Sequence, residues 1–264
     1  MIEINSFTTG ILGRTGLTVG RLGVSGGYGA PAKAFEMAFE RGCNYFYHGS
    51  LRREGMNTAI RNLCARGMRD KIIVVVQVYW RVEFLFRRSF EKFLQKTGLD
   101  GVDIILLGWY NSHPSQKILD ICAELKEKRL TRFIAISGHN RKVFPEFAKT
   151  GNYDIFHIRY NAANRGAETE VFPNLDAVNR PGIVTYTATR WGGLVNPKKM
   201  PKGERTPLAS DCYRFVLSNP NVNVCIAGPK NMEQMTEALT TLDKGPLSQE
   251  EMARMRRIGD HLRT

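Results

Sequence analysis

The sequence has few cysteines, and none of them forms a motif with another. Zinc and iron–sulfur sites need thiolates at closer spacing than this chain offers. An odd, scattered set of cysteines is typical of reduced thiols in the cytoplasm. We therefore expect no metal site and a cytoplasmic location, given the five positions Cys43, Cys64, Cys122, Cys212 and Cys225.

Long apolar runs are also missing. The longest, residues 72–76 and 104–109, have the length of β-strands, whereas a membrane-spanning helix needs about 20 apolar residues. The first ten residues, MIEINSFTTG, lack the basic segment followed by an apolar one that marks a secretory signal. The sequence thus predicts no membrane partner and no leader peptide.

Acidic residues are scarce relative to basic ones. The chain carries 38 Lys and Arg against 25 Asp and Glu, a formal charge of +13. The basic residues spread along the whole chain, and the densest stretch, residues 86–93, has the spacing of a solvated helix face. We therefore expect no nucleic-acid partner and a preference for anionic small molecules, such as a phosphorylated cofactor or an acidic substrate. The sequence leaves the oligomeric state open.

What the sequence does contain is a regular alternation of strand-like and helix-like segments. Crossovers that are mostly helical require parallel strands. Eight such strands suit an α/β fold with a closed (β/α)8 TIM barrel, and an open doubly wound sheet is the alternative. The helix signal is weakest between residues 160 and 180. The expected strands are residues 21–26, 44–47, 72–78, 103–108, 132–137, 154–158, 183–187 and 222–228.

The two ends of the chain carry elements beyond the eight repeats. Residues 6–20 place glycines among β-prone residues, which indicates an N-terminal β-hairpin ahead of the first barrel strand. In residues 248–264, Ser248 is followed three positions later by Glu251, a capping-box pattern that predicts a helix outside the barrel. No repeat or linker divides the chain, so we expect one barrel domain over residues 1–264.

Five segments carry recognisable motifs: residues 12–27, 98–109, 133–140, 154–161 and 215–239. GLDGVDIILLGW is similar to a G-x-D-x-x-D-x-x-x-L-H-W motif, and DIFHIRYN is similar to D-x-x-Q-x-x-Y-N. In this order, and over nearly the whole chain, the five segments resemble the aldo-keto reductase family. The resemblance implies the barrel fold and a nicotinamide cofactor.

The resemblance fails at the four positions where the family keeps its catalytic Asp, Tyr, Lys and His. Tyr47 stands at the Asp position and Arg52 at the Tyr position. Gln77 stands at the Lys position and Gly108 at the His position. Gln77 has no charge with which to lower a neighbour's pKa, and Gly108 has no side chain. We therefore expect the family's proton relay to be absent and standard aldehyde reduction to be weak or undetectable.

The resemblance carries over better on the cofactor side and implies NADP(H). It implies that Ser137 and His157 form hydrogen bonds with the nicotinamide amide and that Tyr186 stacks on the nicotinamide ring. Plain barrel packing is the alternative for Ser137 and Tyr186. A glycine turn into a helix N-terminus with a lysine beside it is an anion site, although Lys230 also fits a solvated loop lysine. The residues that the resemblance assigns to the adenosine phosphate are Gly228, Lys230 and Gln234.

Several basic and phenolic residues follow the expected strands, where barrels of this type keep their reactive groups. Tyr47 beside Arg52 or Arg53 predicts a phenol whose pKa is lowered by a positive charge. The alternative is that Tyr47 only fills space. His48 and His139 titrate near neutral pH when unperturbed and are further acid–base candidates. The catalytic candidates are Tyr47, His48, Arg52, Gln77 and His139.

A long connection after the seventh barrel strand, residues 187–207, is rich in Gly, Pro and basic residues. It predicts a cover over the barrel mouth, with Arg190 and Trp191 facing an anionic or aromatic substrate. The sequence as a whole favours an NADP(H)-dependent oxidoreductase with a non-standard active site. The alternative is a barrel of reductase ancestry with non-redox chemistry or a ligand-sensing role, because a fold does not fix a function.

Overall fold

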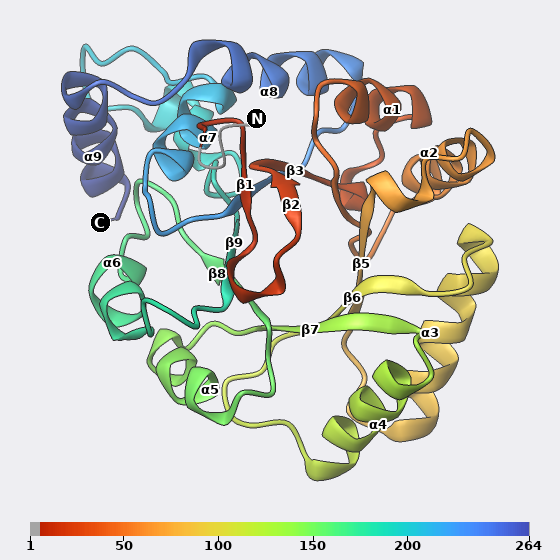
Figure 1. Cartoon of the computed structure of the whole chain (residues 1–264). Coiled ribbons are helices and arrows are strands. Elements are labelled where there is room, and N and C mark those ends of the chain that lie inside the picture. Colours follow the sequence, from red (N-terminus) through yellow and green to blue (C-terminus); the bar gives the residue numbers. More distant parts are fainter. Residues whose placement is uncertain (1–5, 264) are drawn as a thin grey trace.

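The computed structural model describes residues 6–263 and shows a closed barrel of eight parallel strands. Met1 to Asn5, half of the stretch on which the prediction of no leader rests, lie outside the described residues. The strands follow one another around the barrel in chain order, and the last pairs with the first (Figure 1). The predicted barrel is confirmed. Its strands are β3 (Leu22–Ser25), β4 (Tyr45–Tyr47), β5 (Ile73–Val78), β6 (Val102–Leu107), β7 (Thr131–Ser137), β8 (Ile155–Arg159), β9 (Gly182–Tyr186) and β10 (Val224–Ala227).

Helices surround the barrel, and their amphipathic faces pack on the outer side of the strands (Figure 1). The segment between β8 and β9 holds a four-residue α-helix and one turn of 3-10 helix, in keeping with the weak helix signal there. The last helix packs outside the barrel against α7 (Ala209–Leu217). The helices are α1 (Ala32–Glu40), α2 (Glu54–Ala65), α3 (Glu83–Thr97), α4 (Gln116–Glu127), α5 (Phe144–Thr150), α6 (Ala167–Glu170), α7 (Ala209–Leu217), α8 (Met232–Lys244) and α9 (Gln249–Arg263).

The strands alternate between two buried layers, because successive side chains point to opposite faces. In β6, Ile104 and Leu106 belong to the layer inside the barrel, whereas Ile105 and Leu107 belong to the layer under the helices. The same period places Ile73 and Val75 inside. Both faces of each strand are therefore apolar, as parallel sheets require. The inner layer ends at the carboxyl end of the strands in polar residues.

An N-terminal hairpin closes the opposite, amino end of the barrel. Its strands β1 (Thr9–Ile11) and β2 (Thr18–Gly20) pair antiparallel, with a turn of 3-10 helix between them. Leu12 and Val19 join the apolar layer inside the barrel. Arg14 donates to the backbone oxygen of Tyr153, just before β8. The predicted hairpin is confirmed, and the carboxyl end is left as the open face.

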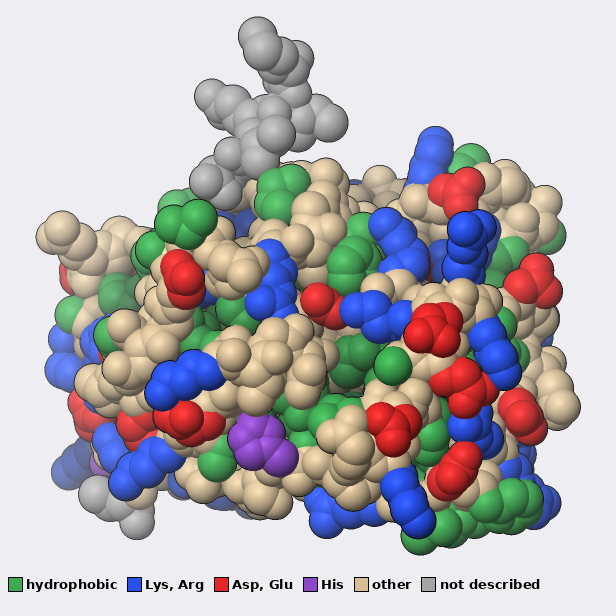
Figure 2. All heavy atoms as spheres, turned by 60° about the horizontal axis from the view of Figure 1, so that its bottom comes forward, with side chains coloured by type: hydrophobic (Ala, Val, Ile, Leu, Met, Phe, Trp, Pro, Cys, Tyr) green, Lys and Arg blue, Asp and Glu red, His purple; other side chains and the backbone are tan. Residues whose placement is uncertain are grey.

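The helical sides of the molecule carry basic and acidic residues side by side. Figure 2 shows this mixture on the face that it presents. Examples are the ion pairs of Arg87 with Glu83 and Glu124, at 3.0 and 2.6 Å. None of the helices in residues 6–263 has the length and apolar character needed to cross a membrane.

Candidate active site

The polar layer at the carboxyl end of the barrel, called here the mouth layer, consists of inward-facing residues. Each lies two positions beyond an inward-facing apolar residue of the same strand, as Gln77 lies beyond Val75 and His157 beyond Ile155. The sequence therefore places these side chains in the mouth by strand period alone. The mouth layer is Tyr47, Gln77, Ser137, His157 and Tyr186.

Gln77 organises one side of the mouth layer. Its amide oxygen accepts hydrogen bonds from the hydroxyls of both Tyr47 and Tyr79, the second at 3.0 Å. Gln77 is only 8% exposed. Two phenols thus share one neutral acceptor, and the proton of Tyr47 is directed at an amide oxygen rather than into the open mouth.

Gly108 makes room for this arrangement. A Cβ at position 108 would lie 2.5 Å from the side-chain nitrogen of Gln77 and 2.8 Å from the ring of Tyr79. These contacts are too close for any larger residue, so a side chain here would displace both neighbours. The space above β6 is therefore filled by groups from β5 and its loop.

The expectation that an arginine lowers the pKa of Tyr47 is wrong. Burial raises the pKa of Tyr47 well above its ordinary value of 10, and the neighbouring Tyr79 raises it further. Arg52 is exposed, with its side chain against Gly29 rather than against Tyr47. Tyr47 is accordingly a protonated, weakly acidic phenol at neutral pH.

His48 lies outside the mouth layer, because the strand alternation turns it toward the helices. Its Nε2 donates to the Asn57 side-chain oxygen at 2.6 Å, and its Nδ1 accepts from Arg53 at 3.4 Å. The ring packs edge-on against Phe93. Burial lowers the pKa of His48 to about 4. Both nitrogens of this buried, neutral imidazole are used within the chain.

His139 lies at the rim and pairs with Arg159, which ends β8. A guanidinium nitrogen of Arg159 lies 2.5 Å from Nδ1 of His139. Since a guanidinium only donates, Nδ1 is the acceptor, and a neutral His139 carries its proton on Nε2. Partial burial and Arg159 both lower the pKa of His139. Of the two histidine candidates for catalysis, this one is accessible.

His157 occupies the centre of the mouth layer and is fully buried. Its Nε2 lies 2.8 Å from the hydroxyl of Tyr45, one layer deeper in the barrel. Its ring also lies beside Tyr47, with 5.9 Å between ring centroids. Burial lowers the pKa of His157 to about 3. It is a neutral hydrogen-bonding group across the physiological range.

Tyr186 and Ser137 hold the opposite side of the mouth. The Tyr186 hydroxyl donates to the backbone oxygen of Gly138 at 3.3 Å, so its ring reaches from β9 toward the loop after β7. Ser137 accepts from the backbone nitrogen of Trp109 at 3.2 Å and donates to Leu107 at 3.5 Å. The Ser137 hydroxyl therefore ties two barrel loops together, which is also what plain packing requires.

The loop between β10 and α8 presents an exposed lysine at a helix start. The Asn231 side chain caps α8 by accepting a hydrogen bond from the backbone nitrogen of Gln234 at 2.9 Å. The Gln234 side chain in turn accepts from the backbone nitrogen of Lys230 at 3.0 Å. The ring of Tyr28 covers Gly228, whose Cβ would lie 2.4 Å from it. Lys230 projects from a well-capped turn, and Tyr28 bounds the approach to Gly228.

A hollow of about 270 Å³ opens beside the mouth layer, between the ends of β8 and β9. It is called here the β8–β9 hollow. Its neighbours in the loop after β9 include three non-glycine residues with left-handed backbone, Thr187, Arg190 and Trp191, with φ of 60°, 52° and 55°. Such strain is typical of functional loops. The lining residues are Arg159, Asn161, Asn164, Thr187, Arg190 and Trp191.

The described residues contain no cluster of three or more His, Cys, Asp or Glu side chains that would hold a metal ion. The mouth layer is instead phenolic, amidic and imidazole in character. Basic groups lie at its rim, among them Arg159 and Arg190. The chemistry that this arrangement supports is hydrogen bonding and attraction of negative charge.

Comparison with solved structures finds the same architecture in aldo-keto reductases. The holo form of an aldo-keto reductase from Bacillus halodurans matches with a TM-score of 0.77 at 19% identity, over 95% of this chain and 96% of that one. An aldo/keto reductase from Klebsiella pneumoniae in complex with NADP and acetate matches with a TM-score of 0.77 at 19% identity, over 96% and 95%. No family model and no curated protein sequence matches the chain. At this identity the likeness establishes the fold and leaves the activity open.

Sequence reasoning missed two groups of this site. Tyr28 follows the first barrel strand and would have been found by applying the strand-end criterion to β3 as well as to the later strands. Asn164 lines the β8–β9 hollow from a loop that has no strand or helix pattern. The sequence carried no signal for it, because its position depends on how that loop turns back on Asn161.

Proposed function

We propose that the protein binds NADP(H) across the carboxyl face of the barrel and is an oxidoreductase with weak or atypical carbonyl reduction. The observation that carries this proposal is the position of Tyr186. Its ring extends from the end of β9 toward Gly138 and offers an aromatic surface beside the polar groups of the mouth layer. The shared fold with holo aldo-keto reductases supports the same assignment.

The residues present fit the cofactor at both of its ends. Ser137 and His157 are polar groups on neighbouring strands, positioned for the carboxamide of a nicotinamide ring stacked on Tyr186. Lys230 is exposed at the start of the 13-residue helix α8 and has no ion pair within the described residues. It would meet the extra phosphate of NADP(H), where a helix N-terminus adds its own attraction for anions.

The bound cofactor would supply a hydride to a carbonyl carbon. The chain would have to supply the proton or the positive charge that the carbonyl oxygen needs. Tyr47 keeps its proton at neutral pH but directs it at Gln77, and its raised pKa makes it a poor acid. His139 carries a proton on Nε2 at the rim and is the second candidate donor. The environment raises the pKa of Tyr47 and lowers that of His139, so both shifts lead away from the near-neutral pKa at which a general acid works best.

The alternative, a non-redox ligand-binding role, is favoured by this same lack of an acid. Within the described mouth layer, the pKa of Tyr47 lies far above neutral and that of His157 far below it. A site with such groups binds through fixed hydrogen bonds and exchanges no proton near pH 7. Cofactor binding separates the two functions.

Cofactor binding is measured by tryptophan fluorescence. Trp80, Trp109 and Trp191, the three tryptophans of the chain, follow β5, β6 and β9 on the carboxyl face and are at least half exposed. We expect NADPH to quench them and to bind more tightly than NADH. Lys230→Ala should raise the dissociation constant for NADPH by about tenfold or more, because a charge-assisted contact is lost. Lys202→Ala, an exposed loop lysine, is the matched control.

Equal affinities for the two cofactors would remove the role of Lys230. No quenching at millimolar cofactor would reject the oxidoreductase and leave the ligand-binding alternative. If NADPH binds, the reduction of a panel of aldehydes should be slow. The proton donor is then identified by comparing the rates of Tyr47→Phe and His139→Gln, because the variant of the donor residue should lose most of the residual rate. Turnover at the ordinary rates of reductases would show that the acid lies elsewhere.

A further inference from the structure

The β8–β9 hollow contains two cations that the chain leaves unpaired. Within residues 6–263, the hydrogen bonds of the Arg159 side chain go to the ring of His139 and the hydroxyl of Tyr186, which carry no negative charge. The Arg190 side chain has no hydrogen-bond or ion-pair partner among residues 6–263. Nor does any carboxylate of the described chain lie within ion-pair distance of either guanidinium. Both positive charges therefore remain available to a ligand.

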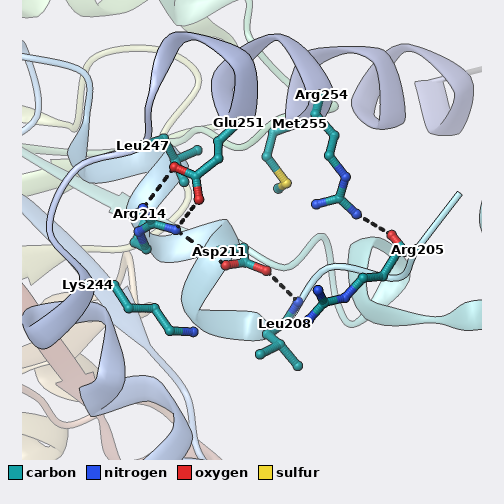
Figure 3. A pocket seen from close by; sticks show the side chains of 9 residues that line it. All are labelled: Arg205, Leu208, Asp211, Arg214, Lys244, Leu247, Glu251, Arg254 and Met255. Atoms are coloured by element: carbon teal, nitrogen blue, oxygen red, sulfur yellow. Dashed lines mark hydrogen bonds and ion pairs between the residues drawn. The ribbon is translucent and has the colours of Figure 1, made fainter.

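A second hollow shows how this chain treats arginine elsewhere. It lies between α7, α8 and α9 and measures about 380 Å³ (Figure 3). There Arg214 points at Glu251, with two bonds of 2.8 and 3.0 Å, and lies 3.6 Å from Asp211. Its charge is neutralised within the protein. Arg205 and Lys244 line this hollow without an ion pair among the described residues, but two acids, Asp211 and Glu251, line it with them. The β8–β9 hollow differs because no carboxylate lines it.

The walls of the β8–β9 hollow are fixed before any ligand arrives. The side-chain nitrogen of Asn161 donates to the backbone oxygen of Thr187 at 2.8 Å. The side-chain oxygen of Asn161 accepts from the backbone nitrogens of Ala163 and Asn164. The backbone nitrogen of Arg190 donates to the same oxygen of Thr187 at 2.8 Å. A loop held in a strained conformation beside two guanidiniums that have no carboxylate partner is preorganised for binding an anion.

We propose that the β8–β9 hollow binds a carboxylate or phosphate group of the small-molecule substrate through Arg159 and Arg190. A guanidinium matches either group with two parallel hydrogen bonds. Trp191, 76% exposed at the edge of the hollow, offers an aromatic surface to the rest of the ligand. The substrate class is therefore an organic anion with an apolar or aromatic body. The inference rests on the proposed function only in calling this ligand a substrate.

The test uses the full chain without cofactor and three probes of one shape. Phenylacetate and phenyl phosphate carry the anion, and phenylacetamide is the neutral counterpart. Calorimetric titration should show binding of both anions and not of the amide. Arg159→Met and Arg190→Met should each weaken anion binding by about tenfold to a hundredfold. Arg88→Met removes the same charge from an exposed position on α3 and should change nothing.

Three results would overturn the proposal. If phenylacetamide binds as tightly as the anions, charge does not drive binding. If anion binding is unchanged in Arg159→Met and in Arg190→Met, the anion binds elsewhere. If free anions fail to bind while NADPH affinity falls in both variants, the occupant is the diphosphate of the cofactor and not a substrate. Anion binding without any NADPH binding would support the site and reject the oxidoreductase, so the two failures are distinguishable.

Discussion

The two ends of the barrel differ in the acids that they hold. At the amino end, the buried Asp103 accepts from Arg69 and Arg132 at 2.9 and 3.1 Å and from the backbone of Val74. Asp154 similarly pairs with a lysine and an arginine. Two other arginines at this end, Arg21 and Arg180, donate to backbone and amide oxygens instead. At the carboxyl end, the arginines of the β8–β9 hollow have no acid among the described residues.

The two ends also differ in how much backbone strain their loops carry. Among residues 6–263, six non-glycine residues have left-handed backbone, and five of them lie in loops that follow barrel strands. The exception, Arg129, ends the turn after α4. Acids that accept from arginines at one end, and strained loops without such acids at the other, are the features of a stabilising face and of the proposed binding face. Each of the following predictions tests that separation.

The largest effect is expected at the amino end. Asp103→Ala should lower the free energy of unfolding by about 3 kcal/mol, because it leaves two arginines and a buried backbone nitrogen without their acceptor. Arg190→Met, at the carboxyl end, should change the same quantity by less than about 0.5 kcal/mol. Urea unfolding of both variants measures this. Similar losses in the two would abolish the distinction between the faces.

A second effect appears with pH, since burial lowers the pKa of His157 to about 3 and that of His48 to about 4. The unfolded chain then binds more protons than the folded one between pH 6.5 and 4, so stability falls as pH falls through this window. Each histidine should contribute about 2 kcal/mol of this loss by pH 4.5.

His157→Gln keeps a hydrogen-bonding side chain that does not titrate. We expect it to remove about half of the acid-dependent loss while leaving stability at pH 7.5 nearly unchanged. Urea titrations from pH 7.5 to 4.5, above the range where most carboxylates protonate, measure both. An unaltered slope would mean that His157 is not held neutral by the barrel.

The smallest effect concerns the strained loop after β9. Arg190→Gly should stabilise the protein by about 1 kcal/mol, because glycine adopts positive φ without a steric cost. The same variant should lose anion binding, as Arg190→Met does, with no gain of stability in the methionine variant. Thermal unfolding compared between the two variants isolates the backbone contribution. A destabilised glycine variant would contradict strain at this position.

The fold followed from the sequence because its signals are local. Each apolar run is strand-length and bounded by turns, so all eight barrel strands lie where the periodicity predicted them. The hairpin and α9 carried their own turn and capping signals, with Glu251 accepting from the backbone of Ser248 as expected. The strand period also placed Gln77 and His157 inside the mouth.

Partners within the site did not follow, because they join distant strands through rotamers that no local pattern encodes. The bond from Tyr47 to Gln77 and the pair of His139 with Arg159 depend on barrel register. The expectation that Arg52 or Arg53 lowers the pKa of Tyr47 was wrong because burial dominates: Arg53 interacts with the phenol, but its charge does not offset the desolvation, and Arg52 lies beside Gly29. His48 was misplaced by one step of the strand period, which turned it away from the mouth.

The hairpin at the amino end has a practical consequence for attaching the protein to a surface. β1 begins at Thr9 on the end of the barrel opposite to the mouth layer (Figure 1). A sensor chip or bead that holds the chain by an N-terminal tag would therefore present the open face outward, away from the support.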